Sequence, residues 1–193
     1  MMKNINTFSF QGIHGAYSEL AGKNNFPNAV SKPCKTFEEM FEAVRTNKAD
    51  IAFVPIENSR AGRVADTQLL IPDSKLKIVG EYFLKVNHCL IAPKGSTMDT
   101  IKRIHSHEQA IAQCRKNLIK TNKDMIVVAD TAGAAKLVSE RNNFEDAAIA
   151  SNLAAKIYNL EIIKENFQDS SNNITRFLIM AKNSIVIKAD EKM

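Results

Sequence analysis

The sequence of 193 residues has few cysteines, and their spacing excludes two classes of protein. Cys34, Cys89 and Cys114 form an odd and widely spaced set. They match neither the ligand spacing of a zinc site nor the disulfide framework of a small secreted protein. We therefore expect reduced thiols in a cytoplasmic protein, with two of them in the core.

Long apolar runs are also missing. Nowhere do about 18 apolar residues follow one another, so we expect no membrane-spanning segment. Residues 1–10 contain one lysine and no apolar stretch long enough for a secretory signal peptide. Both absences favour a cytoplasmic protein that does not contact membranes.

The positive charge is not gathered into clusters. Lysine and arginine number 26 against 21 acidic residues, giving a formal charge of +5, but no four basic residues are consecutive. Few aromatic residues are interleaved with them to stack on bases, which disfavours nucleic acid as a partner. The basic balance indicates a solvated, lysine-rich surface, or a field that attracts a small polyanion.

Several familiar catalytic and metal motifs are absent. The chain has no GxSxG nucleophile elbow, no HExxH metal motif and no Walker phosphate loop. The turn at 12–15 lacks the third glycine of a dinucleotide fingerprint. The histidines have no metal-ligand spacing, so we expect no metal site; they are His14, His88, His105 and His107.

Strand-like and helix-like segments alternate through most of the chain, which predicts an α/β protein with largely parallel sheets. The strands are too many for one small sheet, so we expect two α/β lobes with mixed, mostly parallel sheets. A ligand cleft would lie between the lobes, outside the carboxyl ends of the strands. Lobe 1 would comprise about 1–84 plus 165–193, and lobe 2 about 85–164. The expected strands are 7–11, 30–34, 50–55, 76–84, 87–92, 125–129, 147–150 and 174–181, and the expected helices are 17–24, 64–70, 131–141 and 151–159 with two more that begin at capping boxes.

The capping boxes are Thr36 with Glu39 and Ser106 with Gln109. In each pair a hydroxyl residue is followed three positions later by Glu or Gln, the pattern that satisfies free amides at a helix start. The second would open a helix with Ala110, Cys114 and Leu118 on its apolar face.

Polar residues gather where the predicted strands end, which is where α/β proteins place their sites. For most of these clusters a structural role explains the residues equally well: glycines in a turn, a solvated loop, or a helix cap. The adjacent Thr175 and Arg176, at the start of an apolar strand, fit this reading least. Their side chains should point to opposite faces, and the arginine needs a carboxylate from the protein or from a substrate. The clusters lie at 12–18, 55–64, 106–109, 130–135 and 172–177.

Taken in order, these clusters resemble the motif series of the prephenate dehydratase family, over about residues 7–182. Residues 55–64 carry PIENSxxGxV in full and 173–177 carry the NxTRF signature. Residues 88–90 resemble the HxL segment, 106–114 resemble SHPQAxxQC, 131–135 resemble TAxAA, and 147–160 resemble AAIAS…AAxxYGL. Six motifs in register make the resemblance specific.

The resemblance implies a cofactor-free hydro-lyase that converts prephenate to phenylpyruvate in phenylalanine biosynthesis. It implies a fold of two lobes around a central cleft, of the periplasmic-binding-protein type II, in a homodimer or homotetramer. Thr175 would be catalytic, and Arg176 would be catalytic or support the site. The residues expected at the substrate are Gly15, Tyr17, Ser18, Glu57, Asn58, Ser59, Ser106, His107, Gln109, Thr131, Ala132, Asn173 and Phe177.

The chain departs from the family pattern in three places. In the first motif, usually GPxGTYS, Ile13 replaces Pro and Ala16 replaces Thr, so Ser18 would have to supply a missing hydroxyl. Glu108 replaces the Pro of SHPQ. The family's usual C-terminal ACT regulatory domain would follow the last strand, where the sequence stops, so we expect no ACT domain.

Our mechanistic hypothesis is that the Thr175 hydroxyl gives a proton to the departing hydroxyl group of prephenate. Arg176, Asn58, Ser59 and the helix N-termini at Ser106 and Thr131 would hold the carboxylates and the ketone. Three alternatives stay open: an arogenate dehydratase, a prephenate decarboxylase, and a binding module without catalysis. The intact TRF segment disfavours decarboxylation alone, because protonating the hydroxyl matters only if it leaves.

Overall fold

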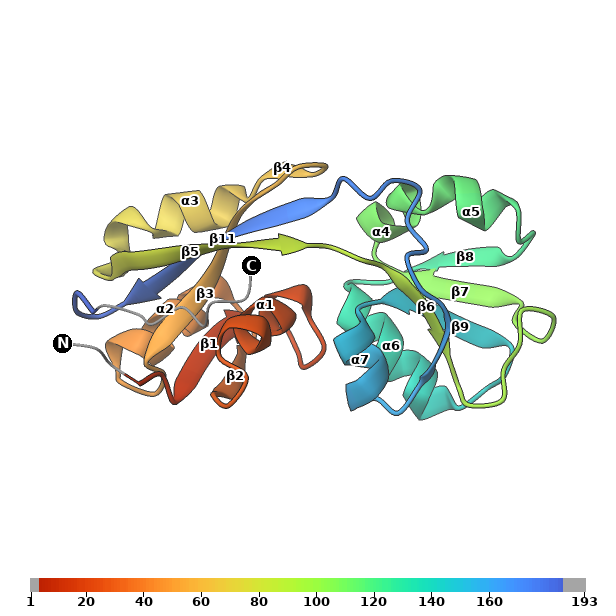
Figure 1. The fold of residues 1–193 in the computed structure, drawn as a ribbon, viewed down its shortest axis with the longest axis horizontal. Coiled ribbons are helices and arrows are strands. Elements are labelled where there is room, and N and C mark those ends of the chain that lie inside the picture. Colours follow the sequence, from red (N-terminus) through yellow and green to blue (C-terminus); the bar gives the residue numbers. More distant parts are fainter. Residues whose placement is uncertain (1–3, 186–193) are drawn as a thin grey trace. The chain divides into compact units, whose positions relative to one another are not determined.

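The computed structural model describes residues 4–185, which form two units: apart from the three residues His14–Ala16, the chain passes from unit 1 to unit 2 after Lys85 and returns after Asn173 (Figure 1). Unit 1 comprises 4–13, Tyr17–Lys85 and 174–185, and unit 2 comprises His14–Ala16 and Val86–Asn173. Residues 165–173 belong to unit 2, because the amide of Phe167 donates to the carbonyl of His88 at 2.8 Å. The expected return to the first lobe near residue 165 is therefore too early.

Unit 1 is built on a mixed sheet with the strand order β2-β1-β3-β11-β5, to which the short β4 adds by pairing with β3. The strands β2, β1 and β3 run parallel, whereas β11 is antiparallel to both β3 and β5. The strands are β1 Thr7–Gln11, β2 Val30–Cys34, β3 Ile51–Asn58, β4 Gly62–Arg63, β5 Lys77–Lys85 and β11 Ile174–Ala181. The helices are α1 Tyr17–Asn25, α2 Phe37–Arg45, α3 Ala65–Leu70 and the 3₁₀ helix η1 Pro72–Ser74.

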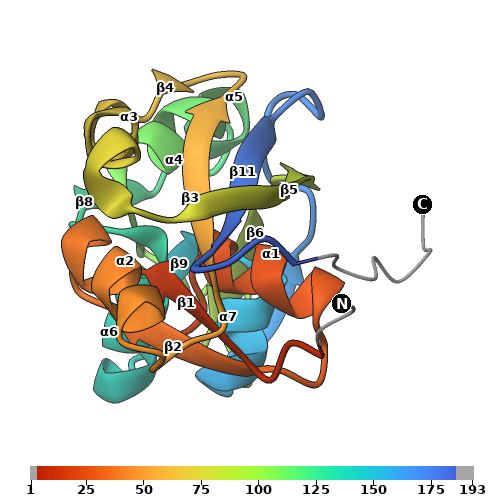
Figure 2. The same ribbon diagram turned by 90° about the vertical axis from the view of Figure 1, so that its left-hand side faces the viewer.

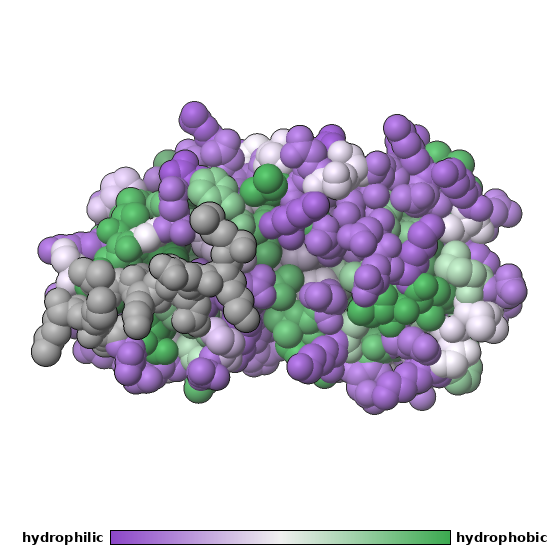
Figure 3. Space-filling model, in the orientation of Figure 1, coloured by the Kyte–Doolittle hydropathy of each residue, from purple (hydrophilic) through white to green (hydrophobic). Residues whose placement is uncertain are grey.

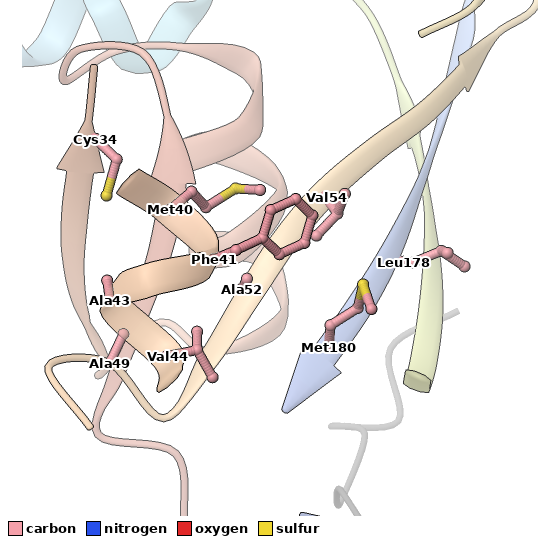
Figure 4. Close-up of a cluster of buried hydrophobic side chains, with 10 residues drawn as sticks. All are labelled: Cys34, Met40, Phe41, Ala43, Val44, Ala49, Ala52, Val54, Leu178 and Met180. Atoms are coloured by element: carbon pink, nitrogen blue, oxygen red, sulfur yellow. The ribbon is translucent and has the colours of Figure 1, made fainter. Parts of the chain in front are cut away.

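Helices α1 and α2 cover opposite faces of this sheet (Figure 2), because apolar side chains alternate along its central strands. Phe53 and Phe177 face α1, and their rings lie 6.4 Å apart in a fully buried aromatic cluster with Phe8. On the other face α2 packs Met40 and its neighbours against β3 and β11 (Figure 4). That cluster contains Cys34, Met40, Phe41, Ala43, Val44, Ala49, Ala52, Val54, Leu178 and Met180.

The predicted start of α2 is confirmed. The Thr36 hydroxyl accepts a hydrogen bond from the Glu39 amide at 3.2 Å, so Thr36 is the N-cap. The Glu39 carboxylate turns back to the amide of Lys35 at 2.8 Å. The backbone amides of Lys35, before the helix, and of Glu39, in its first turn, thus both donate hydrogen bonds to side chains.

Unit 2 has a second mixed sheet with the order β10-β6-β9-β7-β8. The central β9 is buried along its whole length, because helices α6 and α7 cover one face and α4 and α5 the other. Alanines at 134, 148 and 154 allow the close packing of α6 and α7 on that face. The strands are β6 Cys89–Ala92, β7 Arg103–Ser106, β8 Asp124–Val127, β9 Asp146–Ala150 and β10 Glu161–Lys164, and the helices are α4 Glu108–Gln113, α5 Arg115–Ile119, α6 Thr131–Arg141 and α7 Asn152–Ile157.

The expected capping box at Ser106 is wrong. Ser106 is the last residue of β7, where its hydroxyl is buried and donates to the carbonyl of Ile149 at 2.7 Å. His107 caps α4 instead, with its Nδ1 accepting from the Gln109 amide at 3.2 Å. The expected continuous helix is divided at Cys114 into α4 and α5.

All three cysteines are free and buried, one more than expected. Burial raises the pKa of the Cys114 thiol to about 12, so it stays protonated at neutral pH. Within residues 4–185, no helix combines the length and the apolarity needed to cross a bilayer. Hydrophilic residues predominate on the face drawn in Figure 3, with smaller hydrophobic patches between them.

Candidate active site

The predicted catalytic threonine lies where the end of β3 meets the start of β11. Thr175 pairs with Asn58 across the two antiparallel strands, and the Asn58 amide nitrogen donates to the Thr175 hydroxyl oxygen at 2.8 Å. Thr175 is partly buried. Two residues 117 positions apart in the sequence are thereby joined through their side chains.

The loop that follows Asn58 holds this arrangement in place. The Asn58 side-chain oxygen accepts from the amides of Arg60 and Ala61, each at 2.9 Å. Next to it, the Ser59 amide donates to the carbonyl of Ile174 at 2.9 Å, and the Ser59 hydroxyl accepts from the amide of Ile174 at 3.0 Å. The loop therefore fixes the residue that precedes Thr175 as well as the Thr175 side chain itself.

Arg176 points away from Thr175, as expected for neighbours in a strand. Its guanidinium binds the Glu81 carboxylate of β5 through Nε at 2.9 Å and through NH2 at 2.7 Å, and lies 5.7 Å from the centroid of the Phe83 ring. The carboxylate partner that the sequence required is thus supplied by the protein. Since Arg176 and Thr175 occupy opposite faces, we regard Arg176 as a support for the β5–β11 pair.

Four other predicted site residues of unit 1 have different surroundings. Phe177 is only 1% exposed and belongs to the aromatic core, which accounts for its presence after Thr175 and Arg176. Glu57 is exposed on β3, opposite Arg63 of β4 and Arg176 of β11 in the strand register. Tyr17 and Ser18 begin α1 and are partly buried.

Gly15 belongs to unit 2, where the two residues that cap α7 form hydrogen bonds to the turn that contains Gly15. The buried Ser151 hydroxyl donates to the carbonyl of Gly15 at 2.7 Å, and the Tyr158 hydroxyl donates to the carbonyl of His14 at 2.7 Å. Gly15 has a φ of +91°, and a Cβ there would lie 2.9 Å from the backbone of Ala154. This position therefore requires glycine both for its conformation and for the close approach of α7.

We expect Gly15→Ala to lower the melting temperature more than the matched variant Gly62→Ala. Gly62 has a similar φ of +82°, but a Cβ there meets nothing within 4 Å. Both variants carry the strain of a positive φ, about 1–3 kcal/mol. Overpacking against Ala154 should add a further ~1–3 kcal/mol in Gly15→Ala alone. Thermal unfolding followed by circular dichroism checks this, and equal losses would contradict the close contact.

The other predicted residues of unit 2 divide into buried and accessible ones. Ser106 and Ala132 are buried and serve the sheet and the packing of α6. Thr131 is the first residue of α6 and is partly buried, and the carboxylate of Asp130 caps this helix by accepting from the Gly133 amide at 2.7 Å. His107 is partly buried and Gln109 is exposed.

Asn173 is part of a polar network that sequence reasoning did not assemble. Its amide nitrogen donates to the side-chain oxygen of Gln113 at 2.6 Å, and Nε2 of His88 lies 2.9 Å from the same oxygen. Burial lowers the pKa of His88, so the ring is neutral at neutral pH, and Nε2 carries the proton because the amide oxygen only accepts. The motif matches at 88–90 and 106–114 include His88 and Gln113, but they do not indicate that these side chains contact each other and Asn173.

No group of three or more His, Cys, Asp or Glu residues in the described part of the chain is arranged to hold a metal ion. The Thr175 hydroxyl is bonded to the Asn58 amide, and the loop that follows Asn58 holds both this amide and the neighbouring Ile174. The Asn58 amide and its loop can orient the Thr175 hydroxyl, and an oriented hydroxyl can position a substrate and transfer a proton to it.

Comparison with known proteins places the chain in a family. The family model for prephenate dehydratase matches residues 8–185. The bifunctional N-acyl-homoserine lactone acylase/prephenate dehydratase of Komagataeibacter europaeus is 43% identical over 181 residues, which cover 94% of this chain and 64% of that protein. Arogenate dehydratase/prephenate dehydratase 2 of Arabidopsis thaliana is 43% identical over 178 residues, which cover 92% of this chain and 47% of that protein.

A solved structure supports the same assignment. The prephenate dehydratase of Arthrobacter aurescens, in complex with L-Phe, is 31% identical and superposes with a TM-score of 0.85 over 94% of this chain and 62% of that one. The chain spans about half to two thirds of the length of these relatives. Because the family model covers nearly the whole described chain, the protein belongs to the prephenate dehydratase family.

Proposed function

We propose that the chain converts prephenate to phenylpyruvate, acting as a hydro-lyase in phenylalanine biosynthesis. The observation that carries this proposal is the partly buried Thr175 hydroxyl, held by Asn58 at 2.8 Å within the family's TRF segment. Membership of the family supports the same reaction.

The reaction needs few groups from the protein. In prephenate, the bond between the ring carbon and its hydroxyl oxygen breaks, and its electron pair leaves with the oxygen, which takes a proton to become water. The bond from the ring to the carboxylate breaks at the opposite carbon, and its pair enters the ring, which becomes aromatic as carbon dioxide departs. Thr175 supplies the proton at the leaving oxygen and regains one from solvent.

The remaining predicted residues divide into two roles in this proposal. Accessible side chains are assigned to the substrate, and side chains that are buried or, like Arg176, held in an ion pair are assigned to the support of the site. The first group comprises Tyr17, Ser18, Glu57, His107, Gln109 and Thr131, and the second comprises Ser106, Ala132, Asn173, Arg176 and Phe177.

Arogenate is the second candidate substrate. It differs from prephenate by an amino group in place of the side-chain ketone, and several relatives about 42% identical are named arogenate dehydratases. The dehydration at the ring is the same for both substrates, so the Thr175 arrangement suits either.

The test is to incubate the purified protein with prephenate, or with arogenate, at neutral to mildly basic pH. Phenylpyruvate is followed by its absorbance in alkali, and phenylalanine by mass. Formation of phenylpyruvate from prephenate supports the proposal, and a higher kcat/KM for arogenate would reassign the substrate. Loss of carbon dioxide alone would indicate a decarboxylase, and binding without turnover would indicate a binding module.

We also propose a cytoplasmic homodimer or homotetramer. The buried free thiols suit a reducing compartment, and closed symmetric assemblies are the commonest among soluble oligomers. Light scattering coupled to gel filtration would give the mass in solution, and the mass of a single chain would contradict this assembly.

A further inference from the structure

We infer that Asn58 is a positioning residue for Thr175: it turns the threonine hydroxyl so that its hydrogen is available to donate to the substrate. This inference rests on the proposed dehydratase reaction and adds a role within the same site. It replaces the expectation that Asn58 holds a substrate carboxylate or ketone.

The orientation of the Asn58 amide is fixed by the loop that follows it. Its side-chain oxygen accepts from the amides of Arg60 and Ala61, each at 2.9 Å. A flipped amide would set its own N–H groups against these two donors and would lose both hydrogen bonds. The nitrogen of the Asn58 amide therefore has to face Thr175.

The consequence for Thr175 follows from the inventory of a hydroxyl group. It has one hydrogen to donate and two lone pairs that accept. At 2.8 Å the Asn58 nitrogen occupies a lone pair, so the hydroxyl hydrogen points elsewhere. Among residues 4–185 no group accepts that hydrogen, and the side chain is only partly buried. The hydrogen is thus free for a substrate oxygen.

The same geometry excludes a different use of Thr175. A nucleophilic threonine needs a neighbouring base that takes its proton. Asn58 does the reverse, because it donates to the oxygen and draws electron density from the O–H bond. Hydrogen bonds in such a chain strengthen one another. The arrangement therefore suits a proton donor.

The adjacent residues Asn58 and Ser59 position Thr175 in different ways. Ser59 makes two hydrogen bonds to the backbone of Ile174, at 2.9 and 3.0 Å, and thereby fixes the start of β11. Asn58 fixes the direction of the hydroxyl. If this division holds, removing the Asn58 amide should change turnover and leave substrate binding nearly unaltered.

The first experiment is a double-mutant cycle with prephenate as substrate. We expect Asn58→Ala to lower kcat on the order of 10²-fold, the scale associated with a misplaced catalytic group, with KM nearly unchanged. Thr175→Ala should lower kcat at least as much, and the double variant should be no slower than Thr175→Ala alone. Multiplied losses in the double variant, or a raised KM with wild-type kcat in Asn58→Ala, would overturn the inference.

A second variant tests the direction of the hydrogen bond. Asn58→Asp keeps the size of the side chain but replaces the donor with an acceptor, which captures the Thr175 hydrogen. We expect kcat at neutral pH to be as low as in Asn58→Ala. As the pH falls and the introduced carboxyl group becomes protonated, it can donate again, so the ratio of variant to wild-type kcat should rise. A ratio that does not change with pH, or wild-type turnover, would count against the inference.

The matched control is Asn24→Ala on the exposed side of α1. It removes an amide of the same unit that contacts the Tyr82 hydroxyl at 3.3 Å and not Thr175. We expect wild-type kcat and KM, with similar circular dichroism spectra for all variants. A wild-type protein that forms no phenylpyruvate would overturn the proposed function and this inference together. An active wild type with multiplied losses would overturn the inference alone.

Discussion

Thr175→Ala is expected to reduce kcat for phenylpyruvate formation on the order of 10²–10⁴-fold, the usual contribution of proton transfer by a positioned side chain. The variant removes the hydroxyl that Asn58 holds at 2.8 Å and leaves the strand pairing of β11 with β3 and β5 intact. KM for prephenate should change little, because the hydroxyl acts on the leaving group only as the bond breaks. Steady-state kinetics measured by phenylpyruvate absorbance provide the test.

Thr175→Ser is the matched control for this variant. It keeps the hydroxyl and removes only a methyl group, so we expect most of the wild-type turnover. The neutral hydrogen bond lost in Thr175→Ala contributes about 1 kcal/mol to stability, so both proteins should remain folded at the assay temperature. Wild-type turnover in Thr175→Ala, or an equal loss in Thr175→Ser, would rule out the hydroxyl as the proton donor.

The second large effect is expected on the stability of unit 2. The Asp146 side chain is 2% exposed and accepts hydrogen bonds from Nε of Arg103 at 2.7 Å and from Nε2 of His105 at 3.1 Å. The other ring nitrogen of His105 has no partner among the described residues, so the ring depends on this carboxylate. Asp146→Ala leaves the buried His105 ring without a hydrogen-bond partner among the described residues, which typically costs about 1–3 kcal/mol, whereas Arg103 keeps Glu145. For a chain of this length the melting temperature should fall by about 5–10 °C.

The effect of Asp146 should depend on pH in a defined direction. Burial raises the pKa of its carboxyl group, but the hydrogen bonds and charges of Arg103 and His105 outweigh burial, and the net pKa is lowered. A carboxyl group whose pKa is lower in the folded state stabilises the protein above its unfolded pKa, about 3.9. That contribution is lost as the pH falls through the folded pKa, so the difference between wild type and variant should shrink below about pH 4.

Glu145→Ala is the control for this prediction. Glu145 is the preceding residue and pairs with Lys102 and Arg103, but 39% of its side chain is exposed. Ion pairs this exposed contribute little to stability, so the melting temperature should hardly change. Thermal unfolding of both variants at pH 7 and at pH 3 decides the matter. Similar losses at pH 7 would show that burial gives Asp146 no special role.

Much of the fold could be predicted where local pattern and tertiary environment agree. The bounds of β1, β2 and β11 coincide with the predicted strands, and in β11 this is because an apolar run is bounded by polar residues. Strand β7 was missed because Arg103, His105 and Ser106 make it look polar. Those side chains are satisfied by Asp146 and by the carbonyl of Ile149, more than 40 residues away. No local pattern contains such a partner.

The site could be predicted as a set of residues but not as a set of contacts. The motifs identified Asn58 and Thr175 separately, and only the antiparallel pairing of β3 with β11 brings them together. The TRF motif also marked Phe177 as a substrate residue, whereas its side chain lies in the aromatic core, beyond an irregularity in the β3–β11 pairing between Arg176 and Phe177. Gly15 appeared to belong to the first lobe with β1, but its turn is held by Ser151.

The strand order of unit 1 has a consequence for how the protein is made. Among the strands of residues 4–185, β5 pairs with β11 alone, and β11 lies between β3 and β5. Yet β11 follows the whole of unit 2 in the sequence. During translation β5 therefore has no strand to pair with until unit 2 has been synthesised. Unit 2 can fold in that interval, because domains generally fold as units. In refolding of the whole chain the same strand is disfavoured by sequence separation, because Thr175 and Asn58 are 117 positions apart, whereas the contacts of β7 with β9 span 41–43 positions. Pulse-labelled hydrogen exchange should therefore show the amides of β11 protected later than those of β9. A nascent chain from which residues 174–181 have not yet emerged would leave β3 and β5 without β11 between them, so Thr175 reaches Asn58 only after unit 2 has been synthesised.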